Sequence, residues 1–233
     1  MPRQLSQEEL DRAHLDCERQ DLLDALLQTS VETFGIHWRH YPHVFNYPWI
    51  ASRLEKLGTG STALEIGAGA NPLPLYLASR GLKVDTIDNS EIVRGLPPDD
   101  DWNEWGYLDY GMLHSSISSF NADVTAFQPP RRYDAIFSVS VLSLMPTPVR
   151  EEKLRLCRSW LNPQGMLLLA IDLIPGTDTL WNRGGSNESA EQHGAYHDVE
   201  RQLTDLGFRI TESRIMREVW HSRTDLHFLE AQL

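Results

Sequence analysis

An acid and two glycines follow an apolar run in the stretch ALEIGAGANPLPLYLASRG, which covers residues 63–81. Glycine tolerates positive φ and has no Cβ, so Gly67 and Gly69 would let the backbone turn sharply and approach a ligand closely. Asn71 followed by Pro72 is typical of a helix start, and the first turn of a helix offers unpaired N–H groups. A carboxylate at Glu65 would repel a pyrophosphate but suits an ammonium group. The stretch therefore predicts a turn that binds a cationic ligand.

This turn departs from the dinucleotide-binding fingerprint Gly-x-Gly-x-x-Gly. Gly67 and Gly69 match its first two glycines, but Pro72 stands where the third glycine would let the helix pack closely against the strand. Pro72 and Glu65 together disfavour an NAD-dependent oxidoreductase.

The segments that follow resemble the motifs of a known family and occur in the same order. LEIGAGAN resembles the first motif of class I S-adenosylmethionine-dependent methyltransferases, acid-x-Gly-x-Gly-x-Gly, with Asn71 at the third glycine. VDTIDNS resembles the family's second strand, NADVTAF its third motif, RYDAIFSVSVLSLM its fourth strand and loop, and LNPQG the turn before its fifth strand. The resemblance runs from about Ala63 to the C-terminus and rests on the order and spacing of these motifs.

The resemblance implies that S-adenosylmethionine binds and leaves as S-adenosylhomocysteine. Asp88, at the end of the second strand, would hold both ribose hydroxyls, and Asp123 would accept from the adenine amino group. Arg39 and Tyr47, in the aromatic segment before the core, could meet the methionine carboxylate. The residues expected at the cofactor are Glu65, Gly67, Ala68, Gly69, Asn71, Asp88, Asn89, Ser90, Asp123, Val124, Ser138, Arg39 and Tyr47.

The loop after the fourth strand bears on the methyl acceptor. Methyl transfer from a sulfonium depends mainly on positioning, and a base is needed only if the acceptor must lose a proton. The loop lacks the Asn/Asp-Pro-Pro-aromatic tetrad of enzymes that methylate nucleobase or glutamine amino groups. It reads Leu142-Ser143-Leu144 where the family commonly has Leu-Glu-His, so no histidine base carries over at this place.

Three other regions could form the acceptor pocket: HWRHYPHVFNYPW, the long insert GLPPDDDWNEWGYLDYGMLHSSISSF, and IPGTDTLWNRGGSNESAEQHGAYH. The third is glycine-rich, and residues 175–194 within it are expected to be a poorly packed, mobile lid. Core packing is the simpler account of Trp38, Phe45 and Trp49. No metal site is expected, because the acidic run at residues 99–101 has no second ligand cluster. The residues expected to bind the acceptor are His37, Tyr41, His114, Ser140 and Trp181, with His193 as the candidate base.

The elements that must position these residues alternate between strand and helix. STALEI, KVDTID, DAIFSVSV and GMLLLAIDL are predicted strands, and NPLPLYLASRG, TPVREEKLRLCRSWL and YHDVERQLTDLGF are predicted helices. RITESRIMREVW and DLHFLEAQL have no helix between them, so they should pair antiparallel. The predicted fold class is α/β, a three-layer Rossmann-like methyltransferase sandwich with a mostly parallel seven-stranded sheet and an antiparallel C-terminal strand pair.

Residues 1–58 are expected to form an N-terminal helical cap or lid, and residues 59–233 the methyltransferase domain. A capping box from Ser6 to Glu9 predicts the first helix start. A short helix is expected in PWIASRLEKLG, with Pro48 near its start. In residues 147–161, Thr147 is the expected cap and Pro148 the first helical residue. The expected apolar face of that helix is Val149, Leu156, Cys157, Trp160 and Leu161.

Composition limits the classes of partner. The chain has 233 residues, of which 41% are hydrophobic, with seven tryptophans and a net charge of -12. This acidity argues against a nucleic-acid backbone and an anionic membrane surface. Two cysteines suggest no disulfide framework, the N-terminus is too polar for a signal peptide, and no apolar run approaches membrane-spanning length. We expect a cytoplasmic globular protein, monomeric or homodimeric.

The sequence therefore predicts an S-adenosylmethionine-dependent methyltransferase acting on a small molecule, with oxygen, nitrogen and carbon acceptors left open. A protein methyltransferase is an alternative, because an acidic enzyme could favour a basic protein segment. Another alternative is a cofactor-binding protein of the same fold that is regulatory or non-methylating.

Overall fold

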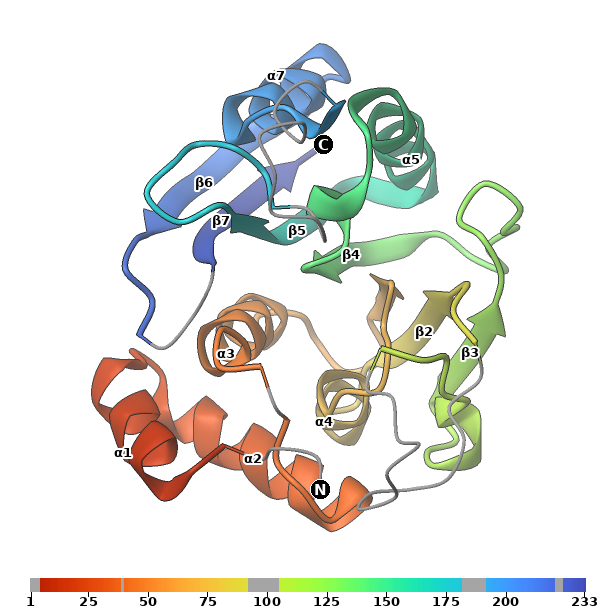
Figure 1. The fold of residues 1–233 in the computed structure, drawn as a ribbon. Coiled ribbons are helices and arrows are strands. Elements are labelled where there is room, and N and C mark those ends of the chain that lie inside the picture. Colours follow the sequence, from red (N-terminus) through yellow and green to blue (C-terminus); the bar gives the residue numbers. More distant parts are fainter. Residues whose placement is uncertain (1–4, 39, 92–104, 182–191, 221–223) are drawn as a thin grey trace. The chain divides into compact units, whose positions relative to one another are not determined.

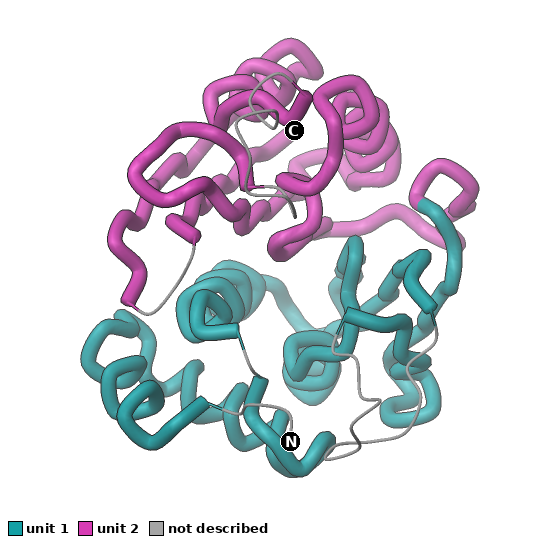
Figure 2. The backbone as a smooth tube through the Cα atoms, viewed as in Figure 1, with its two compact units in different colours: residues 1–123 teal, residues 124–233 magenta. Residues whose placement is uncertain are grey.

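The computed structural model describes residues 5–38, 40–91, 105–181, 192–220 and 224–233 (Figure 1). The chain forms two compact units, Met1–Asp123 and Val124–Leu233, which Figure 2 colours separately. We call them unit 1 and unit 2. No helix among the described residues is both long and apolar enough to cross a membrane.

Unit 1 begins with three helices, α1 (Gln7–Asp16), α2 (Gln20–Phe34) and α3 (His43–Leu54). The predicted capping box is confirmed, because the Ser6 hydroxyl accepts from the Glu9 N–H and the Glu9 carboxylate accepts from the Ser6 N–H. Helix α2 packs against α3. The first part of the chain is thus helical, and its role as a cap or lid stays a prediction.

The prediction that Pro48 starts a short helix is wrong. Helix α3 begins at His43, and Pro48 lies in its interior. A proline inside a helix removes one backbone hydrogen bond and costs about 3 kcal/mol. Here every side chain from His43 to Ala51 is buried, so tertiary packing outweighs that local cost.

The remainder of unit 1 is a parallel strand group. It contains β1 (Thr62–Ile66), α4 (Leu73–Ser79), β2 (Lys83–Asp88), the 3-10 helix η1 (Tyr110–Met112) and β3 (Ile117–Asn121). Strand β2 pairs in parallel with both β1 and β3, and α4 packs against β2 and β3. The register places Ile66 beside Ile87 and Asp88 beside Asn121, so the carboxyl ends of the strands meet at one edge.

Unit 2 contains β4 (Tyr133–Val139), the 3-10 helix η2 (Leu142–Leu144), α5 (Thr147–Trp160), β5 (Leu161–Leu173), α7 (Tyr196–Asp205), β6 (Arg209–Met216) and β7 (Asp225–Gln232). Strands β4 and β5 are parallel, and β7 runs antiparallel to both β5 and β6. The strands belong to a seven-stranded sheet in the order β3-β2-β1-β4-β5-β7-β6. The predicted α/β fold, with its antiparallel C-terminal pair, is confirmed.

The buried face of helix α5 agrees only in part with the predicted one, since Cys157 and Trp160 are buried as expected but Val149 is not. The helix begins at Thr147, one residue earlier than expected, after Pro146. Val149 is 41% exposed. The buried side chains of the helix are Arg150, Lys153, Leu154, Cys157 and Trp160. An apolar pattern could not reveal this face, because a buried arginine is one of its members.

Arg150 is fully buried and ties three segments together. Its Nε donates to the Gln202 side chain at 2.9 Å, and its Nη1 donates to the carbonyls of Met145 at 3.2 Å and His193 at 2.9 Å. Burial lowers the pKa of its guanidinium to about 10, so the group stays charged at neutral pH. The start of α5, helix α7 and the segment before α7 therefore share one cationic anchor.

Replacing Arg150 with alanine should lower the free energy of unfolding by about 3 kcal/mol, because the variant leaves buried carbonyls without a donor. Arg155→Ala on the same helix is the matched control. Arg155 makes an exposed pair with Glu151, and its loss should cost less than about 1 kcal/mol. Urea unfolding measures both values. Equal losses in the two variants would show that Arg150 is no anchor.

Candidate functional site

The loop after β1 has the conformation that its glycines were expected to allow. Gly67 and Gly69 have positive φ values of 70° and 55°. The Gly67 N–H donates to the carbonyl of Ile87 at 2.8 Å, which fixes the loop to the end of β2. The turn therefore lies at the carboxyl ends of β1 and β2, the edge at which ligands of open α/β sheets bind.

Asn71 holds this turn together with its side chain. Its Nδ2 donates to the Ala68 carbonyl at 2.6 Å and to Glu65 Oε1 at 3.2 Å, and its Oδ1 accepts from the Leu73 N–H at 2.8 Å. Pro72 already has helical angles, with φ −76° and ψ −15°. Helix α4 begins at Leu73 with Pro72 as its N-cap, one residue later than predicted, but the Asn71 side chain still accepts from the first helical N–H and links the helix start to the acid of β1.

Glu65 is 1% exposed, and its Oε2 is buried without a hydrogen-bond partner among the described residues. Burial raises the pKa of this carboxyl group well above its usual value, although the Asn71 amide partly opposes the shift and nearby Asp88 adds to it. A cation bound beside Glu65 would lower the pKa of this carboxyl group and favour its ionised form.

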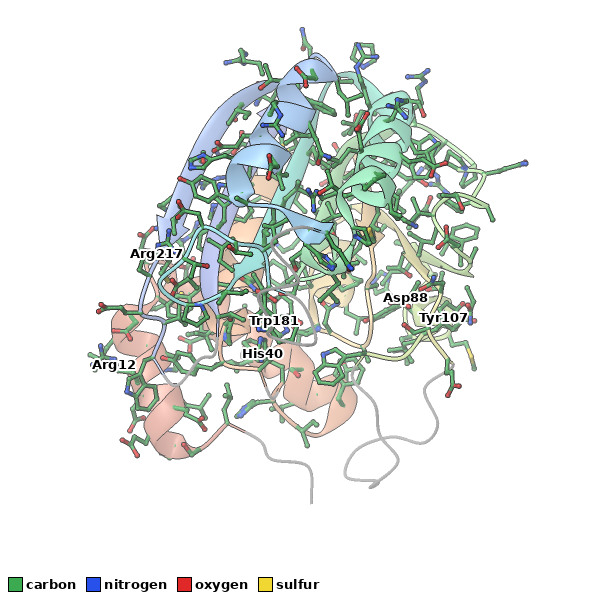
Figure 3. All side chains as sticks on the ribbon, turned by 45° about the horizontal axis from the view of Figure 1, so that its top comes forward. Arg12, His40, Asp88, Tyr107, Trp181 and Arg217 are labelled. Carbon is green, nitrogen blue, oxygen red and sulfur yellow. The ribbon has the colours of Figure 1, made fainter. Side chains whose placement is uncertain are left out.

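Asp88 ends β2 and is 9% exposed (Figure 3). Its Oδ2 accepts from the Gly69 N–H at 3.0 Å, and its Oδ1 accepts from the Ser90 N–H at 2.7 Å. A carboxylate oxygen can accept more than one hydrogen bond, so both oxygens keep capacity for ligand hydroxyls. The carboxylate joins the glycine turn to the end of β2.

The structure brings Asn89 and Asp123 together beside Asp88. Asn89 Nδ2 donates to Asp123 Oδ2 at 3.2 Å, and the Ala122 N–H donates to the Asp88 carbonyl at 3.1 Å. Two further residues expected at the cofactor, Val124 and Ser138, are buried members of unit 2. Their roles stay predictions.

Tyr110 contacts the glycine turn although it is not among the predicted site residues. Tyr110 is fully buried in η1, and its hydroxyl accepts from the Asn71 N–H at 2.7 Å and donates to the Gly69 carbonyl, 2.9 Å away. Burial raises the pKa of this hydroxyl, so it remains a donor. Its position in a long insert gave no signal that it would reach the glycine turn.

The aromatic segment before the core is largely packed. Tyr47 stacks on His43 with ring centroids 4.5 Å apart and meets Trp38 edge-on at 5.2 Å. Tyr41 packs edge-on against Phe45 at 5.9 Å. The core positions expected for Trp38, Phe45 and Trp49 are confirmed by their burial.

Three predicted ligand contacts of unit 1 remain predictions for different reasons. Arg39 lies outside the described residues. His37 is half-buried, and burial lowers the pKa of its ring. His114 accepts from the Ser116 N–H through Nδ1 at 3.1 Å, which is a local turn contact.

In unit 2, Ser140 follows β4 with a positive φ of 57°. Its hydroxyl donates to Asp172 Oδ1 at 3.0 Å. Asp172 lies near the end of β5, and burial raises its pKa to about 7. Sequence reasoning missed Asp172, because it reads as one polar residue inside the apolar strand GMLLLAIDL.

The predicted lid, residues 175–194, is exposed at residues 175–178 but contains packed residues further along. Leu180 is buried, and its N–H donates to the Gly194 carbonyl at 3.0 Å. The Trp181 N–H donates to the Asp172 carbonyl at 2.9 Å. Residues 182–191 lie outside the described part of the chain, so the mobility of the segment stays a prediction.

His193 is buried beside η2. Its Nδ1 lies 3.1 Å from the Ser143 carbonyl, which can only accept, so in the neutral ring Nδ1 carries the proton. This tautomer leaves a lone pair on Nε2, as a base would require. The predicted role of His193 is compatible with that geometry.

Glu65→Gln should make the protein more stable at high pH. Because the pKa of Glu65 is raised on folding, its neutral form stabilises the fold fully below the unfolded pKa, and that contribution is lost as pH rises through the folded pKa. Glutamine stays neutral throughout. The variant's gain in unfolding free energy over the wild type should therefore be near zero at pH 4.5 and at least about 1 kcal/mol at pH 8.

Urea unfolding at the two pH values measures the gain, with the exposed Glu91→Gln as the control that should show no such pH dependence. A gain for Glu65→Gln that is the same at both pH values would contradict the raised pKa.

No protein-family model and no curated protein matches the chain. Solved structures do match. The Burkholderia thailandensis 1,6-didemethyltoxoflavin-N1-methyltransferase, solved with 1,6-didemethyltoxoflavin and S-adenosylhomocysteine, is 15% identical with a TM-score of 0.60, over 100% of this chain and 92% of that chain. The N-methyltransferase NodS from Bradyrhizobium japonicum WM9, solved with S-adenosylhomocysteine, is 15% identical with a TM-score of 0.55, over 97% and 96%.

The [4+2]-cyclase SpnF also matches, with 13% identity and a TM-score of 0.57 over 79% of each chain. At these identities the likeness concerns the fold. The chain has the Rossmann-like fold of class I S-adenosylmethionine-dependent methyltransferases.

Proposed function

We propose that this protein is a methyltransferase that uses S-adenosylmethionine and acts on a small molecule. The observation that carries the proposal is Glu65, a buried acid with one unpartnered oxygen beside the glycine turn. An ammonium group would supply the missing partner, and the methionine part of this cofactor carries one. The bound cofactor would supply a methyl group activated on a sulfonium.

Each residue around the turn would bind a different part of the cofactor. Glu65 would bind the ammonium group, and Asp88 would accept from the ribose hydroxyls while it keeps the Gly69 N–H. Asn89 and Asp123, already hydrogen-bonded to each other, would recognise the adenine edge. We also propose Ala68, Ser90, Val124, Ser138, Arg39 and Tyr47 as cofactor contacts.

The turn is held in place before any ligand binds. Tyr110 and Asn71 fix its backbone from two sides through hydrogen bonds at Gly69, Asn71 and Ala68. A rigid turn loses less entropy on binding, which raises affinity. Pre-organisation of this kind is expected where positioning is the main contribution to the reaction.

The acceptor is proposed to be a small molecule. The net charge of -12 disfavours a nucleic acid, and the Burkholderia methyltransferase was solved with 1,6-didemethyltoxoflavin and S-adenosylhomocysteine bound. His37, Tyr41, His114, Ser140 and Trp181 are the proposed acceptor contacts, and His193 is a candidate base. We further propose a cytoplasmic protein, monomeric or homodimeric.

A non-methylating protein of the same fold is the second candidate, because a neighbour of similar TM-score is described as a cyclase. Two experiments test the choice. Calorimetry with S-adenosylmethionine, S-adenosylhomocysteine and NAD should show binding of the first two alone. Mass spectrometry of metabolite pools incubated with methyl-labelled cofactor should then show a labelled small molecule. Binding without any labelled product would favour the non-methylating candidate, and binding of NAD alone would overturn both.

Asp88→Ala should weaken S-adenosylmethionine binding by about 10- to 100-fold, because hydrogen bonds to a charged group contribute about 1.5–3 kcal/mol. Calorimetry measures the dissociation constant. The exposed Glu91→Gln, three residues further along, is the control and should bind within about twofold of the wild type. An unchanged affinity in Asp88→Ala would remove Asp88 from the site.

Tyr110→Phe should weaken cofactor binding about 5- to 30-fold although Tyr110 itself need not touch the ligand, because the Asn71 N–H loses its acceptor and the turn loosens. Tyr107→Phe, close by in the sequence, is the matched control, since no described residue bonds to its hydroxyl. If the two variants bind the cofactor equally well, the turn does not depend on the Tyr110 hydroxyl.

A further inference from the structure

Ser140 has a strained backbone at the carboxyl end of β4. A non-glycine residue with positive φ costs about 1–3 kcal/mol and is retained mainly where function uses it. Two hydrogen bonds to β5 hold Ser140 in this conformation. Its N–H donates to the Ala170 carbonyl at 2.8 Å, and its hydroxyl donates to Asp172 Oδ1 at 3.0 Å. In this backbone conformation the serine hydroxyl donates to the carboxyl group of Asp172.

Asp172 is a buried acid without a cation. Its residue is 4% exposed, and the Ser140 hydroxyl is its one side-chain partner among the described residues. Burial is the main cause that raises its pKa to about 7, and the serine hydrogen bond partly opposes the shift. Carboxylates are almost never buried in this way unless paired.

The charged groups on neighbouring elements are engaged elsewhere. On β7 the register partner of Asp172 is Leu226, and strand alternation turns the flanking Asp225 and His227 to the other face. Asp225 pairs with Arg217 at 3.1 Å, and His227 bonds to Ser213 at 2.9 Å.

The segment after β5 and the helix η2 bring no charge to Asp172 either. Asp178 pairs with Arg217 at 2.6 Å. His193 meets the Ser143 carbonyl, and Trp181 meets Asp172 only through backbone atoms. Among the described residues, no ion pair involves Asp172.

The pair lies at the edge where ligands bind in this class of fold. Strands β4 and β5 are parallel neighbours, with Val139 beside Ala170 in the register. Ser140 follows Val139 directly and Asp172 is two residues after Ala170, so both lie at the carboxyl ends of their strands. Ligands of open α/β sheets bind outside the carboxyl ends of the strands.

We infer that Asp172, oriented by Ser140, is the base that takes a proton from the methyl acceptor. The acceptor is accordingly a small molecule whose attacking atom carries a weakly acidic N–H or O–H. This inference rests on the proposed methyltransferase function and narrows its substrate class. It also assigns the base to Asp172 in place of His193.

The step balances without a further reagent. The acceptor's nitrogen or oxygen forms a bond to the methyl carbon, and the carbon–sulfur bond breaks with its electron pair going to sulfur. The acceptor's proton passes to Asp172 and leaves to water after the product departs. A base whose pKa lies near the working pH serves this step best, because it is ionised yet still basic enough to bind the proton.

The test is the rate of label transfer from methyl-labelled S-adenosylmethionine into a small-molecule pool, measured from pH 5.5 to 9. The wild-type rate should rise with pH through a midpoint near the Asp172 pKa of about 7 and then level off. Asp172→Asn keeps the shape and an acceptor for Ser140, so it should fold and bind S-adenosylmethionine normally. Its rate should fall by about 100-fold or more and lose the pH step.

Ser140→Ala supplies a second readout that a purely structural role would not move. It removes the hydrogen bond that favours the carboxylate, so the midpoint of the rate profile should shift to higher pH. Asp134→Asn is the control, because Asp134 is also a hydrogen-bonded acid but lies at the amino end of β4. It should leave both the rate and the midpoint unchanged.

His193→Gln separates the two candidate bases. If it abolishes the pH step while Asp172→Asn retains it, the base is His193 and the inference is wrong. An Asp172→Asn protein that transfers label at the wild-type rate and midpoint would also overturn it. A wild-type protein that binds S-adenosylmethionine but labels no small molecule would instead refute the proposed function, and the inference with it.

Discussion

The site of unit 1 depends on a buried carboxyl group that has no cation beside it. Glu65 is the last residue but one of β1, with one oxygen bound to Asn71 and the other without a partner among the described residues. Removing a carboxylate from water costs several kcal/mol unless a charge compensates for it, so burial raises the pKa of this group well above its usual value. A cationic ligand would reverse this state. The glycine turn, the Asn71 bridge and the Tyr110 hydroxyl hold the backbone beside this acid in a single conformation.

Unit 2 repeats the same physical situation with a different consequence. Asp172 is also buried without a cation, but its partner is the hydroxyl of a strained serine. Glu65, near the end of β1, has an oxygen available to bind a positive group. Asp172, with a pKa of about 7, suits the uptake and release of a proton. The two buried acids therefore suit different tasks, Glu65 the binding of a positive group and Asp172 the transfer of a proton.

Much of this arrangement could be predicted from the sequence. The strand and helix alternation, the antiparallel closing strands and the glycine turn all come from local patterns, which the fold then follows. Contacts between residues distant in the sequence could not be predicted. Tyr110 contacts Asn71, which is distant in the sequence. Arg150 is buried although apolar periodicity cannot predict a buried arginine, and Asp172 lies within an apolar strand. Helix α3 also continues past Pro48, because the burial of its side chains outweighs the low helix propensity of proline.

The central claim is that Glu65 ionises when a cationic ligand binds beside the glycine turn. Calorimetry of S-adenosylmethionine binding at pH 6, in two buffers with different heats of ionisation, measures it directly. The wild type should release a fraction of a proton on binding, and Glu65→Gln should bind more weakly and release none. Equal proton release and equal affinity in the two proteins would contradict the account.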